Sequence, residues 1–262
     1  MRIYGVDKMI YQGSKSKWAS RIWGFMMQGL AEKGIFPPAD THFVEPMCGG
    51  CGMTAFVPFK NRIANDINSD IIAYHQRIVE DTSWLSEPDL LLVTKERYLD
   101  VKEHPEKYTP SYRGFVGIHY SWGASYFQGY APAGTLEEVA QKAYNSALYD
   151  SEKLKGVIFS NKDYRDLYYP PKSLVYFDIP YRGTKGYKDH NGKDVKFDYD
   201  AFFDFAEYLD GEGHFVFFSE FDPELPKWVI RVGSFERPAK FGRKKNSVLF
   251  LPESNNVVEN CA

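Results

Sequence analysis

Residues 41–55 read THFVEPMCGGCGMTA, an apolar segment that runs directly into a glycine-rich turn. The segment 41–45 predicts a short strand, and residues 50–55 satisfy the pattern G-x-G-x-x-G/A, which joins a strand to a helix in dinucleotide-binding folds. A second strand is expected at 61–65, followed by Asp66 and then by a helix with a regular apolar repeat. This order of strand, turn, helix, strand and acid predicts the start of a parallel α/β sheet.

The glycine turn and Asp66 together indicate a site for a ligand that carries a ribose. Glycines let the backbone approach a ligand closely, and the start of a helix offers unpaired N–H groups. A carboxylate at the end of the next strand can accept hydrogen bonds from both ribose hydroxyls. Two other interpretations stay open at this point. The ligand could be NAD rather than a methyl donor, or the turn could serve close packing while Asp66 caps a helix.

The rest of the chain continues the alternation of strands and helices, with one interruption. Amphipathic helices are expected over 18–30 and 199–209. Further strands are expected at 156–160, 173–177, 213–219, 228–231 and 247–251, the last two flanking a basic connection. Between 94 and 151 the periodicity is poor. We therefore predict one α/β domain formed by 1–93 and 152–262, with an irregular insertion at 94–151.

A second informative stretch, Phe177-Asp178-Ile179-Pro180-Tyr181, follows an apolar strand, at the edge where doubly wound sheets bind ligands. The exocyclic amine of adenine is a weak nucleophile because its lone pair is delocalised into the ring. The Asp178 carboxylate and the Ile179 carbonyl could both accept its N–H bonds and free that lone pair, while Tyr181 stacks on the extruded base. A strand-end turn containing Asp and Pro is the simpler interpretation of these residues alone. The combination with the glycine turn favours methyl transfer.

With these motifs in this order, the chain resembles the Dam-like DNA adenine methyltransferases, most closely the compact phage and prophage versions, from about residue 9 to residue 252. The resemblance implies a doubly wound, mostly parallel Rossmann-like sheet that binds S-adenosylmethionine and releases S-adenosylhomocysteine. It assigns catalysis to Asp178, Ile179, Pro180 and Tyr181. It assigns cofactor binding to Tyr11, Gly13, Ser14, Lys15, Glu45, Pro46, Cys48, Gly49, Gly50, Gly52, Asp66, Ile67, Asp163, Tyr164 and Asp178.

The resemblance also implies double-stranded DNA as the partner and makes 94–151 the target-recognition insertion. Between Lys107 and Leu136 there is no Asp or Glu, and aromatic residues alternate with glycines. A basic stretch at 231–245 is expected to contact phosphates. The DNA contacts expected from the insertion, the loop after the catalytic motif and the basic stretch are Arg113, Tyr120, Trp122, Tyr126, Lys185, Tyr187, Arg237, Lys240, Arg243 and Lys244.

Composition limits the class of protein. The 262 residues carry a formal net charge of −3, which argues against coating of nucleic acid by bulk charge, although aromatics reach 17%. No apolar run is long enough to span a membrane, and the start lacks the apolar core of a secretory signal, so a cytoplasmic protein is expected. Cys48 and Cys51 have C-x-x-C spacing, but no second pair completes a zinc site, so no metal is expected.

Alternatives to an active DNA enzyme also follow from the sequence. Ile179 stands where the related enzymes usually have proline, which removes a fixed φ and allows a weak or inactive relative that binds cofactor or DNA. An amino-methyltransferase acting on RNA or on a protein glutamine is a further alternative. The recognition sequence, a monomeric state and a cognate restriction nuclease as partner are not decided by the sequence.

Overall fold

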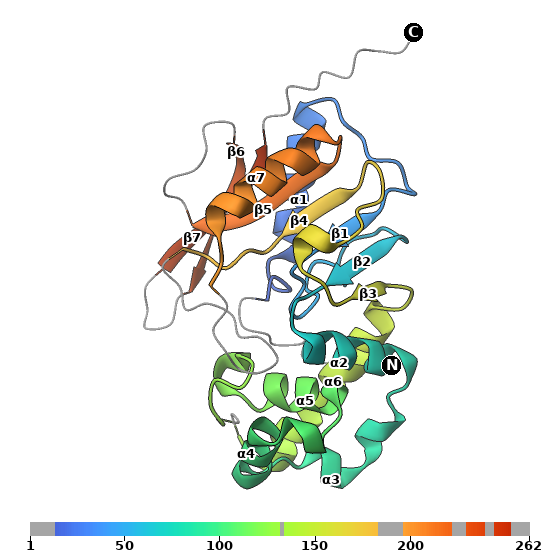
Figure 1. The fold of residues 1–262 in the computed structure, drawn as a ribbon, viewed down its shortest axis with the longest axis vertical. Coiled ribbons are helices and arrows are strands. Elements are labelled where there is room, and N and C mark those ends of the chain that lie inside the picture. The colour runs from blue at the N-terminus through green and yellow to red at the C-terminus, as the bar shows by residue number, and fades with distance from the viewer. Residues whose placement is uncertain (1–13, 132–133, 183–195, 222–228, 239–243, 253–262) are drawn as a thin grey trace.

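The computed structural model describes residues 14–131, 134–182, 196–221, 229–238 and 244–252, and it is built around one seven-stranded sheet (Figure 1). The strand order is β3-β2-β1-β4-β5-β7-β6. The first five of these run parallel, and β7 runs antiparallel to both of its neighbours. The strands are β1 Phe43–Glu45, β2 Arg62–Asn65, β3 Ile158–Ser160, β4 Leu174–Phe177, β5 Phe215–Phe221, β6 Val229–Pro238 and β7 Lys244–Pro252.

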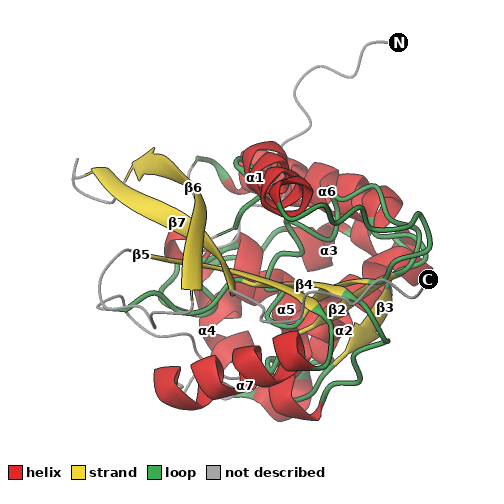
Figure 2. Ribbon diagram, turned by 90° about the horizontal axis from the view of Figure 1, so that it is seen from above, coloured by secondary structure: helices red, strands yellow, loops and turns green. Residues whose placement is uncertain are grey.

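Helices cover both faces of the sheet, which confirms the expected doubly wound α/β fold. The helices are α1 Ala19–Glu32, α2 Ser69–Glu80, α3 Pro88–Leu91, α4 Lys95–Glu103, α5 Pro110–His119, α6 Leu136–Lys153 and α7 Tyr199–Gly211. Figure 2 shows the sheet edge-on, with α1 on one side and α7 on the other. Among the described residues, no helix combines the length and the apolar character that crossing a membrane would need.

The central strand β4 is buried on both faces, as its uninterrupted apolar sequence requires. Leu174 and Tyr176 pack in the core on the α1 side, together with Phe43 of β1. Val175 and Phe177 pack in the core on the α7 side. Because successive side chains of a strand point to opposite faces, one short strand joins the two layers.

The topology places a ligand site at the carboxyl ends of β1 and β4. These two strands are neighbours in the sheet, yet the chain leaves β1 toward β2 and leaves β4 toward β5 on the other side. The connections therefore diverge at this point, and in open α/β sheets such a point is where ligands bind. The residues that end β1 and follow β4 are Glu45 and Asp178.

The block 94–151 is mostly helical, so the expectation of irregular structure was wrong. Three threonines cap its helices by accepting a backbone N–H bond: Thr94 for α4, Thr109 for α5 and Thr135 for α6. Thr135 also forms a capping box with Glu138. These helices share an apolar core with α2 and with residues between α2 and α4, and they form the lower part of the molecule in Figure 1.

The glycine turn does not open a helix, which corrects a second expectation. After β1 the chain makes consecutive turns over 49–56. Cys51 has a φ of 53°, in the left-handed region that non-glycine residues rarely adopt, and this interrupts any helix that might start at the glycines. The backbone N–H of Thr54 donates to the Glu45 carboxyl group at 2.8 Å rather than to a carbonyl in a regular helix.

Candidate active site

A pocket lies where β1, β2 and β4 end, between the glycine turn and the segment that precedes α7. Every described residue that the sequence assigns to the cofactor lines this pocket: Ser14, Lys15, Glu45, Pro46, Cys48, Gly49, Gly50, Gly52, Asp66, Ile67, Asp163, Tyr164 and Asp178. Pro180 of the catalytic motif lines it as well. The fold therefore brings two separate groups of predicted residues to one cavity.

Glu45 ends β1 and places a buried carboxyl group in the pocket, with 2% of the residue exposed. Its Oε2 accepts hydrogen bonds from the backbone N–H, at 2.8 Å, and the hydroxyl of Thr54. Burial, together with the nearby Cys51 and Asp178 and against the effect of the Thr54 hydrogen bonds, raises the pKa of Glu45 to about 8. A cation bound in the pocket would favour the ionised form.

Asp66 follows β2 and ties the glycine turn to the start of α2. Its Oδ2 accepts the backbone N–H of Gly49 at 2.9 Å, and its Oδ1 accepts that of Asn68 at 2.9 Å. The Asn68 side chain in turn caps α2 by accepting the N–H groups of Asp70 and Ile71. Burial raises the pKa of Asp66, while these backbone bonds oppose the shift. The carboxylate is thus held in place at the pocket wall.

A buried histidine of α2 is hydrogen-bonded to the glycine turn. His75, on α2, donates from Nε2 to the carbonyl of Gly49 at 2.7 Å. Burial disfavours charge on both His75 and Cys51, but the hydrogen bond of Cys51 with Cys48 and the mutual attraction of Cys51 and His75 outweigh it. The pKa of Cys51 is therefore lowered and that of His75 is raised. His75 was not predicted, because a lone histidine in a helix carries no sequence signal.

Asp178 follows β4 and forms a buried ion pair with the ammonium group of Lys15. The side chains of Lys15 and Asp178 are only 2% and 13% exposed. The Lys15 Nζ also lies 5.0 Å from the centroid of the Tyr181 ring. A Cβ on Gly52 would lie 2.8 Å from the backbone N of Ser16, so glycine is needed for the turn to approach the Lys15 segment.

The loop after Asp178 is held by packing and by two hydrogen-bonded anchors. Ile179 is fully buried in the core between β4 and α7. The carbonyl of Pro180 accepts a 2.8 Å bond from the Tyr199 hydroxyl, and the N–H of Arg182 donates to the buried Glu220 carboxylate at 3.2 Å. These contacts hold the loop at a position that lacks the fixed φ of a proline.

The remaining wall of the pocket includes residues that the sequence did not indicate. Asp163 accepts two bonds of 2.8 Å from the guanidinium of Arg165, and Tyr164 lies next to this pair. The lining residues outside the predicted set are Met47, Lys162, Arg165, Lys196, Phe197 and Asp198. Lys162 and Arg165 flank the predicted Asp163 and Tyr164, so their position was a usable signal. No motif marks 196–198.

A comparison with protein families matches residues 11–214 to the D12 class N6 adenine-specific DNA methyltransferases. The chain belongs to this family. The match covers the glycine turn, the helical block and the Asp178 motif, and it shows an adenine-specific DNA methyltransferase. A comparison with curated proteins finds no match. Within the described part of the chain, no group of three or more His, Cys, Asp and Glu side chains is arranged to hold a metal ion.

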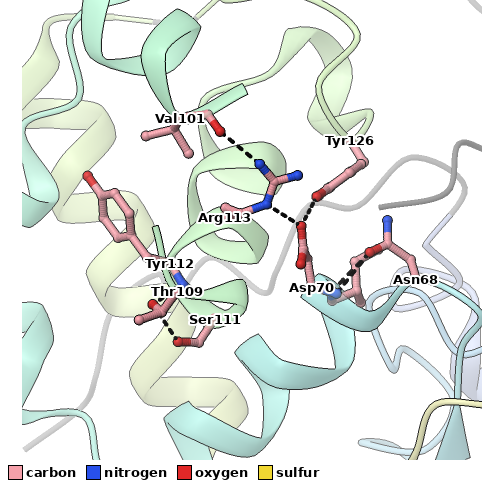
Figure 3. A network of polar contacts seen from close by, with 9 residues as sticks. Asn68, Asp70, Val101, Thr109, Ser111, Tyr112, Arg113 and Tyr126 are labelled. Carbon is pink, nitrogen blue, oxygen red and sulfur yellow. Dashed lines mark hydrogen bonds and ion pairs between the residues drawn. The ribbon is translucent and has the colours of Figure 1, made fainter. Parts of the chain in front are cut away.

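In this methyltransferase, two of the residues expected to contact DNA are buried in a polar network between helices (Figure 3). Arg113, on α5, pairs through Nε with Asp70 of α2 at 2.8 Å and donates to the carbonyl of Val101 at 2.9 Å. The Tyr126 hydroxyl donates to the same Asp70 carboxylate. Both Arg113 and Tyr126 are 5% exposed. Their predicted role in DNA contact is corrected to one in joining α5 and the segment after it to α2.

Tyr120 is also part of the core of the methyltransferase, whereas Trp122 is on its surface. Tyr120 is fully buried and donates its hydroxyl to the carbonyl of Leu91. Trp122 is 61% exposed. Among the described aromatic residues that were predicted to contact DNA, it is the one on the surface. The absence of acids from Lys107 to Leu136 thus reflects, in large part, the core of a helical unit rather than a DNA-facing surface.

The other residues predicted to contact cofactor or DNA lie outside the described residues or at the edge of the sheet. Tyr11, Gly13, Lys185, Tyr187, Lys240 and Arg243 lie outside the described residues. Arg237 and Lys244 belong to β6 and β7, the antiparallel pair at one edge of the sheet.

Proposed function

We propose that this methyltransferase moves a methyl group from S-adenosylmethionine to the exocyclic amine of an adenine that is flipped out of double-stranded DNA. The observation that carries the proposal is that Asp178 lines the same pocket as Glu45 and Asp66. The acceptor carboxylate of the Asp178 motif therefore opens onto the cavity proposed for the methyl donor.

The residues of the pocket fit such a donor by their chemistry. The Asp66 carboxylate, fixed by Gly49 and Asn68, suits the two hydroxyls of a ribose. The buried carboxyl of Glu45 suits a positively charged group. The rings of Tyr164 and Phe197 line the wall on which an adenine could stack. When bound, S-adenosylmethionine supplies an electrophilic methyl group on a positively charged sulfur.

The residues around Asp178 position and activate the amine. The Asp178 carboxylate and the Ile179 carbonyl accept the N–H bonds of the amine, which returns lone-pair density to the nitrogen. The buried, anchored loop holds these two acceptors in fixed relative positions, so that catalysis consists of positioning and hydrogen bonding. Tyr181 is only 4% exposed, and the Lys15 ammonium lies over its ring. A base can stack on Tyr181 only after this neighbourhood rearranges.

The test measures transfer of tritiated methyl groups from S-adenosylmethionine to mixed-sequence duplex DNA. The wild-type protein is expected to label the DNA. Asp178→Ala should abolish labelling, whereas Asp204→Ala, a matched change on the exposed face of α7, should not. Absence of labelling by a wild-type protein that still binds S-adenosylmethionine would contradict the proposal and favour an inactive relative.

The same assay separates the nucleic-acid substrates. Excess duplex DNA that lacks a capture tag should lower the labelling of a tagged duplex substrate, and excess single-stranded RNA should not. Stronger competition by RNA than by duplex DNA, together with direct labelling of the RNA, would instead favour RNA as the substrate.

A further inference from the structure

Ser219 lies on β5, beside the end of β4, and its hydroxyl contacts Asp178 and Tyr181 of the catalytic motif and the core residue Tyr176. Ser219 is fully buried. Its Oγ is 3.1 Å from the hydroxyl of Tyr181, 2.9 Å from that of Tyr176 and 3.4 Å from Oδ1 of Asp178. One serine thus bridges the acid and the aromatic residue of the catalytic motif.

The directions of these bonds follow from what each group can donate. An ionised carboxylate only accepts, so Ser219 uses its single hydrogen toward Asp178. Its two lone pairs then accept from the hydroxyls of Tyr181 and Tyr176. Burial, with the neighbouring Asp178 adding to it, raises the pKa of Tyr176, so this phenol keeps the proton that it donates. The hydrogen-bonding capacity of Ser219 is therefore fully used.

The contacts of Asp178 are arranged on one side of its carboxylate. Ser219 and the Lys15 ammonium both approach Oδ1. Neither of these two contacts is made to Oδ2, so a hydrogen bond from a substrate amine to Oδ2 does not compete with them for the same oxygen.

We infer that Ser219 is a positioning residue for methyl transfer, because it fixes the Asp178 carboxylate and the Tyr181 ring relative to each other. This inference rests on the proposed function. Ser219 acts through these two residues and does not itself touch the substrate. Its removal should lower kcat by roughly 10- to 100-fold, the range expected when catalytic groups are misplaced by about 1 Å. The affinity for S-adenosylmethionine and the KM for DNA should change little.

The experiment compares Ser219→Ala with Ser219→Thr and with a matched control, Ser173→Ala. Ser173 is an equally buried serine that precedes β4, and its hydroxyl donates to the carbonyl of Pro170, at the other end of that strand. Rates of methylation of duplex DNA, KM values and calorimetric cofactor affinity are measured for each protein. We expect a loss of kcat in Ser219→Ala, recovery of most of it in Ser219→Thr, which restores the hydroxyl, and wild-type kcat in Ser173→Ala.

Three outcomes would overturn the inference. A wild-type kcat in Ser219→Ala would overturn it while leaving the proposed function intact. An equal loss of kcat in Ser219→Ala and Ser173→Ala would show a general packing effect. A wild-type protein that transfers no methyl groups would contradict the proposed function, and the inference with it.

Discussion

At the scale of single residues, the buried carboxyl of Glu45 links pH to cofactor binding. Its pKa is about 8 in the free protein, because burial disfavours the charged form. Below that pH the Glu45 carboxyl group is neutral. Binding of a cation next to it then requires that Glu45 release its proton. The affinity for S-adenosylmethionine should therefore rise with pH, by at most about tenfold per pH unit, until pH 8.

Calorimetric Kd values for S-adenosylmethionine, measured from pH 6 to pH 9 with the wild-type protein and with Glu45→Gln, check this expectation. The amine of the cofactor titrates near the upper end of this range, but it does so equally with both proteins. The ratio of the two affinities should therefore increase toward pH 8 and then level off. A ratio that does not change with pH would show that Glu45 does not face the cation.

Lys15 provides a second prediction at this scale, because it is the buried partner of Asp178. Lys15→Met keeps most of the stem but leaves a largely buried carboxylate without its ion pair. The free energy of unfolding should fall by about 2–4 kcal/mol, somewhat less than for a fully buried pair. Lys17→Met removes the same charge from an exposed site two residues away and should change stability by less than about 0.5 kcal/mol. Urea denaturation measures both, and equal stabilities would contradict the role of the ion pair.

At the scale of helices and strands, the contact between α2 and α5 depends on a glycine. A Cβ added to Gly114 would lie 2.2 Å from the backbone oxygen of Asp70, and a backbone cannot move aside cheaply. Gly114→Ala should therefore destabilise the protein by about 1–3 kcal/mol. Gly24→Ala, on α1 with no atom within 4 Å of its added Cβ, should stabilise it by up to about 1 kcal/mol. Thermal denaturation measures both effects. Shifts of Tm with the same sign in the two variants would contradict this packing.

The helical block yields a prediction that separates core from surface. Arg113→Ala breaks a buried ion pair and should cost about 3–5 kcal/mol of unfolding free energy. Trp122→Ala changes an exposed side chain and should leave stability within about 0.5 kcal/mol. If Trp122 stacks on a base, its loss should weaken DNA binding roughly tenfold. Denaturation and DNA titration of the two variants give the answer, and a stable Arg113→Ala with weakened DNA binding would reverse our assignment.

How far the sequence predicts these elements depends on the kind of signal. Apolar runs and periodicity located α1, α7 and the parallel strands, because burial dictates those patterns. The helices of the block 94–151 were missed although Thr94, Thr109 and Thr135 are visible capping signals. The turns after β1 were missed because Cys51 adopts a left-handed φ, which no local pattern marks at a non-glycine residue.

At the scale of the whole molecule, the site was predictable where motifs exist and hidden where contacts cross the chain. The glycine turn, Asp66 and the Asp178 motif converge on one pocket because parallel strands end at the same edge. The pairing of Arg113 with Asp70 joins residues 43 positions apart, and only the fold reveals that an apparent DNA-binding arginine is internal. Ser219 and His75 belong to the same class of hidden contacts.

Asp178 is proposed to direct methyl transfer to the amine of adenine. The most direct test of this proposal is mass spectrometry of the nucleosides from duplex DNA after incubation with S-adenosylmethionine that carries a trideuteromethyl group. We expect N6-trideuteromethyl-deoxyadenosine with the wild-type protein and none with Asp178→Ala, which removes the acceptor. Label on cytosine, or no labelled nucleoside from a wild-type protein that binds the cofactor, would contradict it.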